Sequence, residues 1–360
     1  MQCELQKDWQ TILNKTQFLK SEFDLTSKNI ALLGAGRYGK VALEQLKKKN
    51  YNIICFLDNS PEKQGNEIAG IPVVSPNSDI LDSVDLIITT IRGINPEITV
   101  DLPSISFDQW YVIQNIDNFK YVRNNLLCDD LSKQTLDKIL LAVLTNDKRY
   151  YSEVTDFNQY FSLPNFRNNY NEFFIDIGAF VGDSIEKFMW ANDGLFKKII
   201  AFEPGKRQYD ASQKRIKRLC EEWALDPESI SLINAGIGGK ESFAEMDLTQ
   251  SHLTSINLIN NEITNKPSSI KITTIDKQLK NIPVTFIKAD IEGMEMVMLM
   301  GAEQTIVKNK PKLAICVYHN INDLVEISEF LKSLVPEYKM AIRHHSYLHS
   351  ETVLYCWIED

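Results

Sequence analysis

The sequence predicts an α/β protein with two separate domains, each built on a mainly parallel sheet. Two segments carry this prediction, because each consists of an apolar strand, a glycine-rich turn and an amphipathic helix: residues 29–39 and 173–183. The length of 360 residues also exceeds the roughly 150 residues of a typical single domain. Two strand–turn–helix segments in a chain of this length favour two domains over one.

The composition excludes several other classes of protein. Hydrophobic residues make up 44% and charged residues 24%, which excludes a disordered, collagen-like or disulfide-scaffold chain. The net charge of −9 argues against nucleic acid as a partner, because phosphate binding needs a basic field. No apolar stretch approaches the ~20 residues of a membrane span, and the first residues do not resemble a secretory signal. The six cysteines are scattered, so we expect a cytoplasmic protein with reduced thiols and no membrane insertion.

We expect residues 1–125 to form the first domain. After its first strand come a glycine turn and a helix over residues 39–51, and two further apolar strands follow at 52–59 and 84–91. The turn has the context of a nucleotide-binding fingerprint, and Asp58 ends the next strand roughly 20 residues on, where a ribose contact is expected. The glycines of this turn are Gly34, Gly36 and Gly39.

Two basic residues beside these glycines, Arg37 and Lys40, could contact a diphosphate; the alternative is that they are solvated helix charges. The alternative for the whole first domain is a structural role without a ligand.

Residues 126–170 are predicted to form a helical connector, because apolar residues recur at helical spacing between 136 and 144. Residues 171–360 then form the second domain. Strands are predicted at 198–203, 231–235, 285–290 and 313–318, in alternation with helices. The last two strands, 339–343 and 353–357, have no obvious helix between them and suggest an antiparallel hairpin at the sheet edge.

The start of the second domain predicts an adenosine site at the carboxyl edge of the sheet. Glycines in the turn let the backbone approach a ligand closely, and Glu203 ends the next strand, where a carboxylate can accept both ribose hydroxyls. The turn is not Gly-x-Gly-x-x-Gly, which argues against a pyrophosphate cradle. The alternative is a helix-packing turn and a solvated glutamate. We assign the following residues to the cofactor: Asp176, Gly178, Ala179, Phe180, Gly182, Asp183, Glu203, Pro204, Ala235, Asp290 and Glu292.

Four motifs of the second domain resemble the FkbM-type S-adenosylmethionine-dependent methyltransferases. They are Phe174-Ile-Asp-Ile-Gly-Ala-Phe-Val-Gly-Asp183, Ala201-Phe-Glu-Pro204, Lys288-Ala-Asp-Ile-Glu-Gly-Met-Glu295 and Tyr318-His319. The closing segments 343–346 and 351–355 resemble the family's final strands. The resemblance covers roughly 159–358, and Lys-x-Asp-x-Glu-Gly-x-Glu is its most specific part.

This resemblance implies a class I methyltransferase sheet of seven strands, mostly parallel with one antiparallel strand. It also implies O-methyl transfer from S-adenosylmethionine, with S-adenosylhomocysteine as product. The acceptors of such enzymes are often sugars of capsule, lipopolysaccharide or other glycans.

Methyl transfer to a sugar hydroxyl needs in-line alignment of donor and acceptor, and it gains from a base that removes the hydroxyl proton. His319 is our first choice for this base, because imidazole titrates near working pH; its alternative is a helix cap. Asp290 is assigned to orienting the sulfonium or the acceptor, and Lys288, on the same strand face, could neutralise that carboxylate. The residues assigned to the acceptor are Tyr318, His344 and His345, of which adjacent His344 and His345 cannot both point into one crevice.

Asp290, Glu292 and His319 could instead bind a divalent metal that polarises the acceptor. No close-spaced ligand motif supports this alternative, so we predict no metal. Glu295 could pair with Lys288 or face solvent.

The first domain carries a second resemblance. Residues 33–76, with Phe56-Leu-Asp-Asn59 and Gly70-Ile-Pro-Val-Val74, resemble the N-terminal Rossmann-like domain of bacterial sugar O-acyltransferases, which there holds a nucleotide sugar. Gly34, Gly36, Gly39 and Asp58 would then bind the acceptor.

We therefore expect a sugar or sugar-nucleotide O-methyltransferase, acting in bacterial surface polysaccharide biosynthesis. A homodimer is left open. The alternatives are an NAD-dependent oxidoreductase and a non-catalytic protein that binds two nucleotides. Against the oxidoreductase, the first domain has no Ser-Tyr-x-x-x-Lys motif that could supply a catalytic acid.

Overall fold

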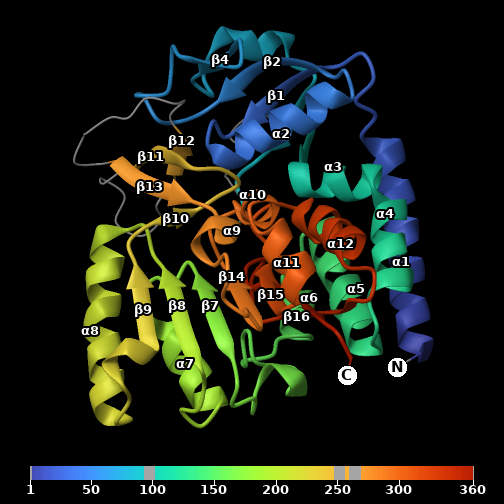
Figure 1. The fold of residues 1–360 in the computed structure, drawn as a ribbon. Helices are drawn as coiled ribbons and strands as arrows, with labels where there is room; N and C mark the ends of the chain where they lie inside the picture. Colours follow the sequence, from blue (N-terminus) through green and yellow to red (C-terminus); the bar gives the residue numbers. More distant parts are fainter. Residues whose placement is uncertain (1, 93–101, 247–255, 259–268, 360) are drawn as a thin grey trace.

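The computed structural model describes the chain except for residues 1, 93–101, 247–255, 259–268 and 360 (Figure 1). Three β-sheets are formed within the described residues: one of six strands, one of four and one of seven. Figure 1 shows the six-stranded sheet and the seven-stranded sheet stacked one above the other, with a group of helices along one side of both.

The six-stranded sheet belongs to the first domain and has the order β3-β4-β2-β1-β5-β6. Only β3 and β4 pair in antiparallel fashion; the other pairs are parallel. The strands are β1 (Asn29–Leu33), β2 (Asn52–Leu57), β3 (Glu67–Ile68), β4 (Ile71–Val74), β5 (Leu86–Thr89) and β6 (Ser104–Ser106). The predicted amphipathic helix is α2 (Arg37–Lys48), which buries Ala42, Leu43 and Leu46.

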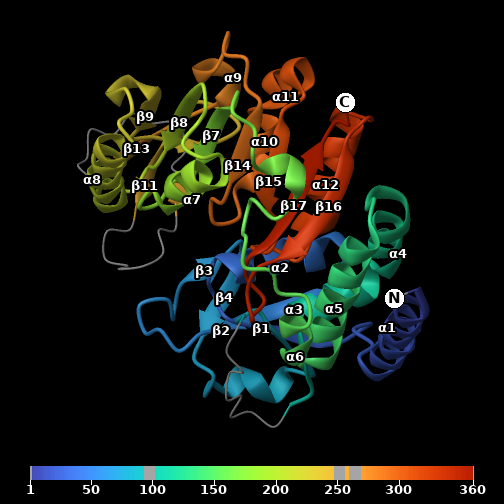
Figure 2. The same ribbon diagram turned by 90° about the horizontal axis from the view of Figure 1, so that it is seen from below.

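A set of helices connects the two domains. It comprises α1 (Gln2–Glu22), α3 (Phe107–Gln114), α4 (Ile116–Tyr121), α5 (Asp130–Thr145) and α6 (Arg149–Ser152), with a π-helical turn at Val122–Leu126 and a 3-10 turn at Pro164–Phe166. A further 3-10 turn, Asp79–Ser83, lies between β4 and β5 of the first domain. Helix α3 begins at a capping box in which Ser106 and Gln109 bond reciprocally. Helix α5 packs against both α1 and β16 of the second domain, so the connector lies along the edge of the second sheet (Figure 2).

The seven-stranded sheet has the order β16-β17-β15-β14-β7-β8-β9. Its strands are β7 (Phe173–Ile177), β8 (Lys198–Phe202), β9 (Ile230–Ile233), β14 (Phe286–Ala289), β15 (Lys312–Cys316), β16 (Lys339–His344) and β17 (Thr352–Trp357). β17 runs antiparallel to both of its neighbours, while the pairs from β15 to β9 are parallel. This confirms the expected mostly parallel sheet with one antiparallel strand. The closing pair is also confirmed, with β17 inside the sheet and β16 at the edge.

The helices of the second domain follow these strands. They are α7 (Asp183–Ala191), α8 (Lys206–Glu222), α9 (Ile275–Gln278), α10 (Glu295–Met300), α11 (Glu303–Asn309) and α12 (Asp323–Leu334), with a 3-10 turn at Pro227–Ser229. The carboxyl ends of β7, β8 and β9 point toward the first domain (Figure 1). Because ligands bind at the carboxyl ends of parallel strands, this orientation places the candidate site between the two domains.

The sequence did not predict the third, four-stranded sheet. It has the order β10-β13-β11-β12 and consists of β10 (Gly236–Ile237), β11 (Ser242–Met246), β12 (Ile256–Leu258) and β13 (Ser269–Thr273). Figure 1 shows it beyond the carboxyl end of β9, between the two larger sheets.

One hydrophobic cluster runs through both domains. It includes Ile30 of β1, Leu140 of α5 and Ile315 of β15, all fully buried. The two α/β units therefore share a core through the connector. Of the helices that the structure describes, none is long and apolar enough to cross a membrane. All six cysteines are free; Cys55, Cys220, Cys316 and Cys356 are buried.

Candidate active site

The glycine turn after β7 lies directly beside the end of β14. Gly178 has φ +79°, and a Cβ at this position would overlap the backbone carbonyl oxygen of Asp290. Gly182, which precedes α7, also has φ +79°, and its Cβ would lie 2.8 Å from Ser212 Oγ. Only glycine combines this backbone conformation with such close approach. The turn therefore brings bare backbone to the carboxyl edge of the sheet, and Phe180 between the two glycines is half exposed.

Glu203 directly follows β8, the strand that pairs with β7, and is buried beside this turn. Its Oε2 accepts a hydrogen bond from the Phe180 N–H (2.9 Å), and its Oε1 accepts one from the Gly205 N–H (2.7 Å). Burial raises the pKa of the carboxyl to about 7, against the opposing effect of these two amide donors. Each oxygen keeps a further lone pair, so the group can still accept two hydroxyls. A fixed carboxylate next to a glycine turn fits the ribose of an adenosine ligand.

Four residues at the ends of β14 and β15 form what we call the acid–histidine cluster: Asp290, Glu292, Glu295 and His319. His319 Nε2 lies 3.6 Å from Asp290 Oδ1 and 3.7 Å from Glu292 Oε2, and its Nδ1 lies 3.0 Å from Glu295 Oε1. The imidazole is 7% exposed and Glu295 is 1% exposed. Burial opposes the charged imidazolium, but the three carboxylates outweigh it and raise the pKa of His319 to about 9. The predicted meeting of Asp290 and His319 at adjacent strand ends is thus observed.

Comparison with known families identifies the second domain. Residues 176–347, just under half of the chain, match the family model of the methyltransferase FkbM domain. Residues 176–347 form an FkbM methyltransferase domain. Residues 26–113 match the model of the C2185-like N-terminal domain, so the resemblance of the first domain to sugar O-acyltransferases stays a prediction. No curated protein sequence matches the chain.

One solved structure agrees with this assignment at the level of the fold. A methyltransferase FkbM from Methylobacillus flagellatus KT is 23% identical, with a TM-score of 0.64 over 98% of this chain and 100% of that one. An rRNA methylase from Streptococcus thermophilus is 15% identical, with a TM-score of 0.33 over 60% and 96% of the two chains. Aeropyrum pernix fibrillarin, crystallised with S-adenosylmethionine, is 9% identical, with a TM-score of 0.31 over 52% and 67%. Only the first likeness is close enough to bear on the architecture, and it extends over both domains.

The methyl donor of the FkbM domain is S-adenosylmethionine, as the sequence predicts. The residues present fit this cofactor, because the glycine turn and Glu203 offer an adenosine both close backbone and a carboxylate acceptor. The other residues assigned to the cofactor follow β7, β8 and β9: Ala179, Pro204 and Ala235 on loops, and Asp183 as the first residue of α7. Whether each contacts the cofactor stays a prediction.

Asp176 and Lys288 form a buried pair beneath the FkbM glycine turn. Lys288 Nζ lies 3.0 Å from Asp176 Oδ1 and donates to the carbonyl oxygen of Gly178 (2.8 Å), while Asp176 Oδ2 accepts from the Ser184 hydroxyl. Burial opposes the lysine's charge, but the carboxylates of Asp176 and Asp290 outweigh it and raise its pKa. Lys288 is thus ion-paired with Asp176, not with Asp290 or Glu295, and the pair supports the turn from inside the sheet.

Two phenols hold the Asp290 carboxylate. Tyr160 donates to Oδ2 (2.8 Å) and Tyr318 donates to Oδ1 (3.2 Å). Burial raises the pKa of both phenols, so they remain neutral donors. Tyr160 comes from the aromatic-rich end of the connector, and no motif marked it in the sequence; only the fold brings it to β14.

His344 and His345, assigned to the acceptor, are held by other partners. His344 is fully buried, with Nδ1 2.8 Å from Thr352 Oγ1. His345 Nδ1 lies 2.6 Å from the carbonyl oxygen of Asp156, and its Nε2 lies 3.0 Å from the Tyr355 hydroxyl. Burial lowers the pKa of both, that of His344 to about 4. These contacts give both residues a packing role at the connector and lend no support to acceptor binding.

The glycine turn of the first domain serves the packing of α2 on β1. A Cβ at Gly39 would overlap the carbonyl oxygen of Gly34, whereas a Cβ at Gly36 would meet no atom within 4 Å. Asp58 already accepts from the Ala35 N–H (2.8 Å), and Lys63 lies 3.0 Å away. Because Asp58 already has these partners, a ribose contact at Asp58 is less well supported, and so is an NAD-dependent enzyme. The space beside Gly36 remains open.

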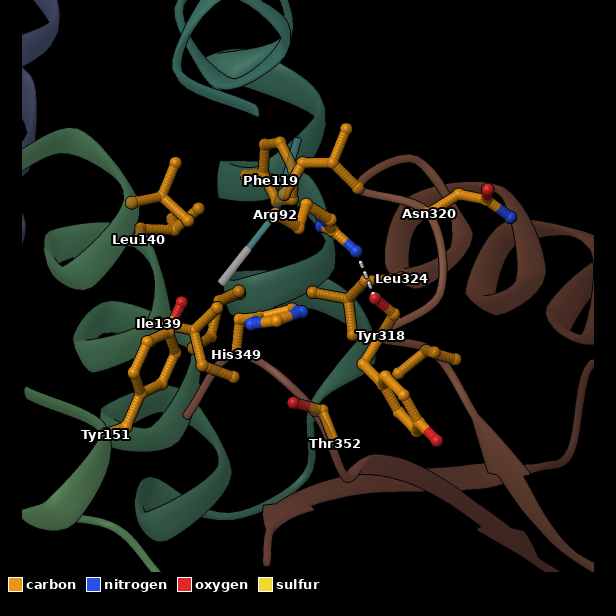
Figure 3. Close-up of a pocket in the computed structure, with 14 residues that line it drawn as sticks. Arg92, Phe119, Ile139, Leu140, Tyr151, Tyr318, Asn320, Leu324, His349 and Thr352 are labelled. Carbon is orange, nitrogen blue, oxygen red and sulfur yellow. Dashed lines mark hydrogen bonds between the residues drawn. The ribbon is translucent and has the colours of Figure 1, made fainter. Parts of the chain in front are cut away.

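Two arginines of the first domain reach the loops that carry the acid–histidine cluster. Arg37 Nη2 donates to Asn320 Oδ1 (3.2 Å) and lies so close to Gly293 that a Cβ there would overlap it. Arg92 donates to the carbonyl oxygen of Tyr318 (Figure 3) and to that of His319 at 3.1 Å. Arg37 is exposed and keeps further N–H donors beside its bond to Asn320, so a solvated charge and a contact to a diphosphate both stay predictions.

A small pocket lies where α5, α6 and the loop after β15 meet (Figure 3). Its lining is mostly apolar, with Leu140, Tyr151 and Leu324 among the labelled side chains. Burial lowers the pKa of His349 in its wall to about 4, so this histidine is neutral. Polar side chains also reach the pocket, among them Arg92, Asn320 and Thr352.

Proposed function

We propose that the protein is an O-methyltransferase that methylates a hydroxyl of a sugar or sugar nucleotide. The observation that carries the proposal is the acid–histidine cluster beside the cofactor turn. Asp290 touches Gly178 through its backbone and His319 through its carboxylate, so the donor site and a set of proton-accepting groups share one strand end. This juxtaposition is what methyl transfer to a hydroxyl requires.

The residues of the chain divide the work of such a reaction. When bound, S-adenosylmethionine supplies an electrophilic methyl group on a sulfonium. Glu203 holds the ribose and the glycine turn fixes the donor's position. Asp290, itself held by two phenols, orients the acceptor hydroxyl. The acceptor oxygen forms its bond to the methyl carbon as the carbon–sulfur bond breaks, with the electron pair left on sulfur. The hydroxyl proton passes to the acid–histidine cluster. We assign it to His319 in its neutral form, which becomes the main form only as the pH rises past its pKa of about 9; at lower pH a carboxylate of the cluster takes the proton.

A polyhydroxylated acceptor suits the surroundings of the cluster. The carboxylate oxygens of Asp290 and the phenol oxygens of Tyr160 and Tyr318 can each accept a further hydrogen bond beside those that they make to one another. The first domain supports a sugar nucleotide in particular, because its glycine turn adjoins this site through Arg37 and leaves room at Gly36. An enzyme that methylates sugar nucleotides would act in surface polysaccharide biosynthesis, and we place it in the cytoplasm. A homodimer stays a prediction.

A release assay tests this proposal. The purified protein is incubated with S-adenosylmethionine and a panel of nucleotide sugars, free sugars, amines and carboxylic acids, and S-adenosylhomocysteine is quantified. We expect release above background with one or a few sugar-containing acceptors, and mass spectrometry should show one added methyl group. Release only with amines or carboxylic acids would overturn the assignment of a sugar hydroxyl.

A further inference from the structure

We infer that the acid–histidine cluster binds a divalent metal cation, with Asp290 Oδ1, Glu292 Oε2 and His319 Nε2 as its protein ligands. This reverses the sequence-based prediction of no metal. The role of the cation, to hold the acceptor hydroxyl, rests on the proposed function; the existence of the site does not.

The two carboxylate oxygens lie at nearly equal distances from the histidine nitrogen, and both distances are close to the separation that a shared cation requires. His319 Nε2 lies 3.6 Å from Asp290 Oδ1 and 3.7 Å from Glu292 Oε2. Ligand atoms about 2.1 Å from a metal lie about 3.0–3.4 Å apart in octahedral or tetrahedral geometry. A small inward movement of the half-exposed Glu292 side chain closes this difference. The same strand ends also bring ligand atoms of Asp290, Glu295 and His319 within 4.8 Å of one another.

An unsatisfied buried nitrogen points to a ligand at this place. His319 is 7% exposed, yet among the described residues neither Nε2 nor Nδ1 has a hydrogen-bond partner; only Nδ1 has a carboxylate oxygen as close as 3.0 Å. The distances to Asp290 and Glu292 are too long for hydrogen bonds. A buried polar atom without a partner is uncommon and calls for a specific reason. A cation between Nε2 and the two carboxylates would satisfy all three groups at once.

The surrounding residues have the arrangement of a second coordination shell. Glu295 Oε1 lies 3.0 Å from His319 Nδ1, and it is held in turn by the N–H of Ile291 (2.8 Å). A carboxylate behind the far nitrogen of a ligating histidine fixes the ring and directs the lone pair of Nε2 to the metal. Tyr160 and Tyr318 hold Asp290 in the same way.

The donor set indicates the class of metal. Two carboxylates and one imidazole favour Mn²⁺ or Zn²⁺, because Mg²⁺ prefers oxygen ligands alone. Three protein ligands leave further positions open for an acceptor oxygen, and a metal-bound hydroxyl loses its proton more readily. With the cation bound, His319 is a ligand, and the hydroxyl proton passes to a carboxylate oxygen of the cluster that does not bind the metal.

Binding of Mn²⁺ alone to the full chain tests the site without any methyl donor. The protein is stripped with EDTA, dialysed and titrated with MnCl₂, and free Mn²⁺ is followed by electron paramagnetic resonance; a parallel titration uses ZnCl₂. We expect one high-affinity site per chain, weakened at least tenfold in both Asp290→Asn and His319→Gln. Glu295→Gln should weaken it about 10- to 100-fold through the ring of His319. Glu221→Gln, an exposed acid on α8, is the matched control and should bind as the wild type does.

Each outcome decides one question. No binding of either metal, or equal binding in the wild type and in folded Asp290→Asn and His319→Gln variants, overturns the site. Methyl transfer to a sugar that proceeds at full rate in EDTA would leave the proposed function standing without the cation. Cluster-dependent Mn²⁺ binding without any methylated sugar would leave the site standing and the function refuted.

Discussion

At the scale of single residues, Glu203 shows how far residue type and position determine a role. Its place after the second strand of the FkbM domain predicted ribose binding, and the structure shows the carboxylate fixed by two backbone amides beside the glycine turn. The pairing of Lys288 with Asp176 could not be predicted, because alternation along a strand gives the face of a side chain but not its partner on the neighbouring strand. Tyr160 was missed for a related reason: it lies 130 residues from Asp290 in the chain.

Removal of the Glu203 carboxylate should weaken donor binding. Glu203→Ala is expected to cost about 1–3 kcal/mol of binding free energy, the loss of hydrogen bonds from the ribose to a charged acceptor. Isothermal titration with S-adenosylmethionine measures this, with Glu221→Ala on the surface of α8 as control. Unchanged donor affinity in Glu203→Ala would remove Glu203 from the cofactor site.

The raised pKa of Glu203 also predicts a pH dependence. Because this pKa is about 7, the carboxyl is mostly neutral at pH 6 and mostly ionised at pH 8. An ionised carboxylate accepts hydrogen bonds more strongly, so the Kd for S-adenosylmethionine should fall as the pH rises through 7. Folding stability should fall as the pH rises from about 4.5 to about 7, because the folded state binds this proton more tightly than the unfolded state does. Both pH dependences should be reduced in Glu203→Gln; a pH-dependent Kd that persists in this variant must come from another group.

His319 should matter for turnover and not for the donor. His319→Ala is expected to lower kcat by ~10²- to 10⁴-fold while the Kd for S-adenosylmethionine is unchanged. Steady-state kinetics and donor titration on the same preparation measure the two effects. Near-normal turnover would show that the reaction needs His319 neither for proton removal nor for cation binding.

At the scale of elements, the strand–turn–helix units were predictable and the small sheet was not. Both glycine turns stand between an apolar run and an amphipathic helix, so local pattern and tertiary structure agree there. The strands β10 to β13 have two to five residues each, and β10 pairs with β13, more than 30 residues further along the chain. Strands this short depend on their partners and leave little pattern in the sequence.

The FkbM glycine turn offers a matched pair of substitutions. Gly178→Ala adds a methyl group that overlaps the carbonyl oxygen of Asp290, whereas Gly65→Ala, at nearly the same φ (+80°), meets no atom within 4 Å. We expect Gly65→Ala to cost about 1–2 kcal/mol of unfolding free energy from backbone strain alone. Gly178→Ala should cost more and should also impair donor binding. Equal losses of stability, measured by denaturant unfolding, would show that the close approach to Asp290 is not required.

At the scale of the whole molecule, the first domain is joined to the FkbM domain at the active-site loops. If the first domain holds the acceptor, its sugar must reach the active site of the second, and the carboxyl ends of β7, β8 and β9 do point toward the first domain (Figure 1). It could not reveal that Arg37 and Arg92 would make the contact, since both bond to loop groups placed only by the fold. The first domain thus contacts the active-site loops whether or not it binds a ligand of its own.

A substitution at Gly36 tests whether it does bind one. Gly36→Asp places a carboxylate in free space at the start of α2, where phosphates would approach the helix N-terminus. We expect a raised KM for a sugar-nucleotide acceptor with unchanged donor affinity. Unaltered acceptor kinetics in a normally folded variant would favour the structural role of this domain.

The most direct measurement of the central claim follows the methyl group itself. The protein is incubated with ¹³C-methyl-labelled S-adenosylmethionine and the sugar acceptor found in the release assay, and the product is examined by nuclear magnetic resonance. The account predicts that the label appears as a methyl ether on one sugar oxygen, and that Glu203→Ala and His319→Ala both reduce its rate of appearance. Label on nitrogen or carbon, or a methyl ether formed at the same rate in both variants, would contradict it.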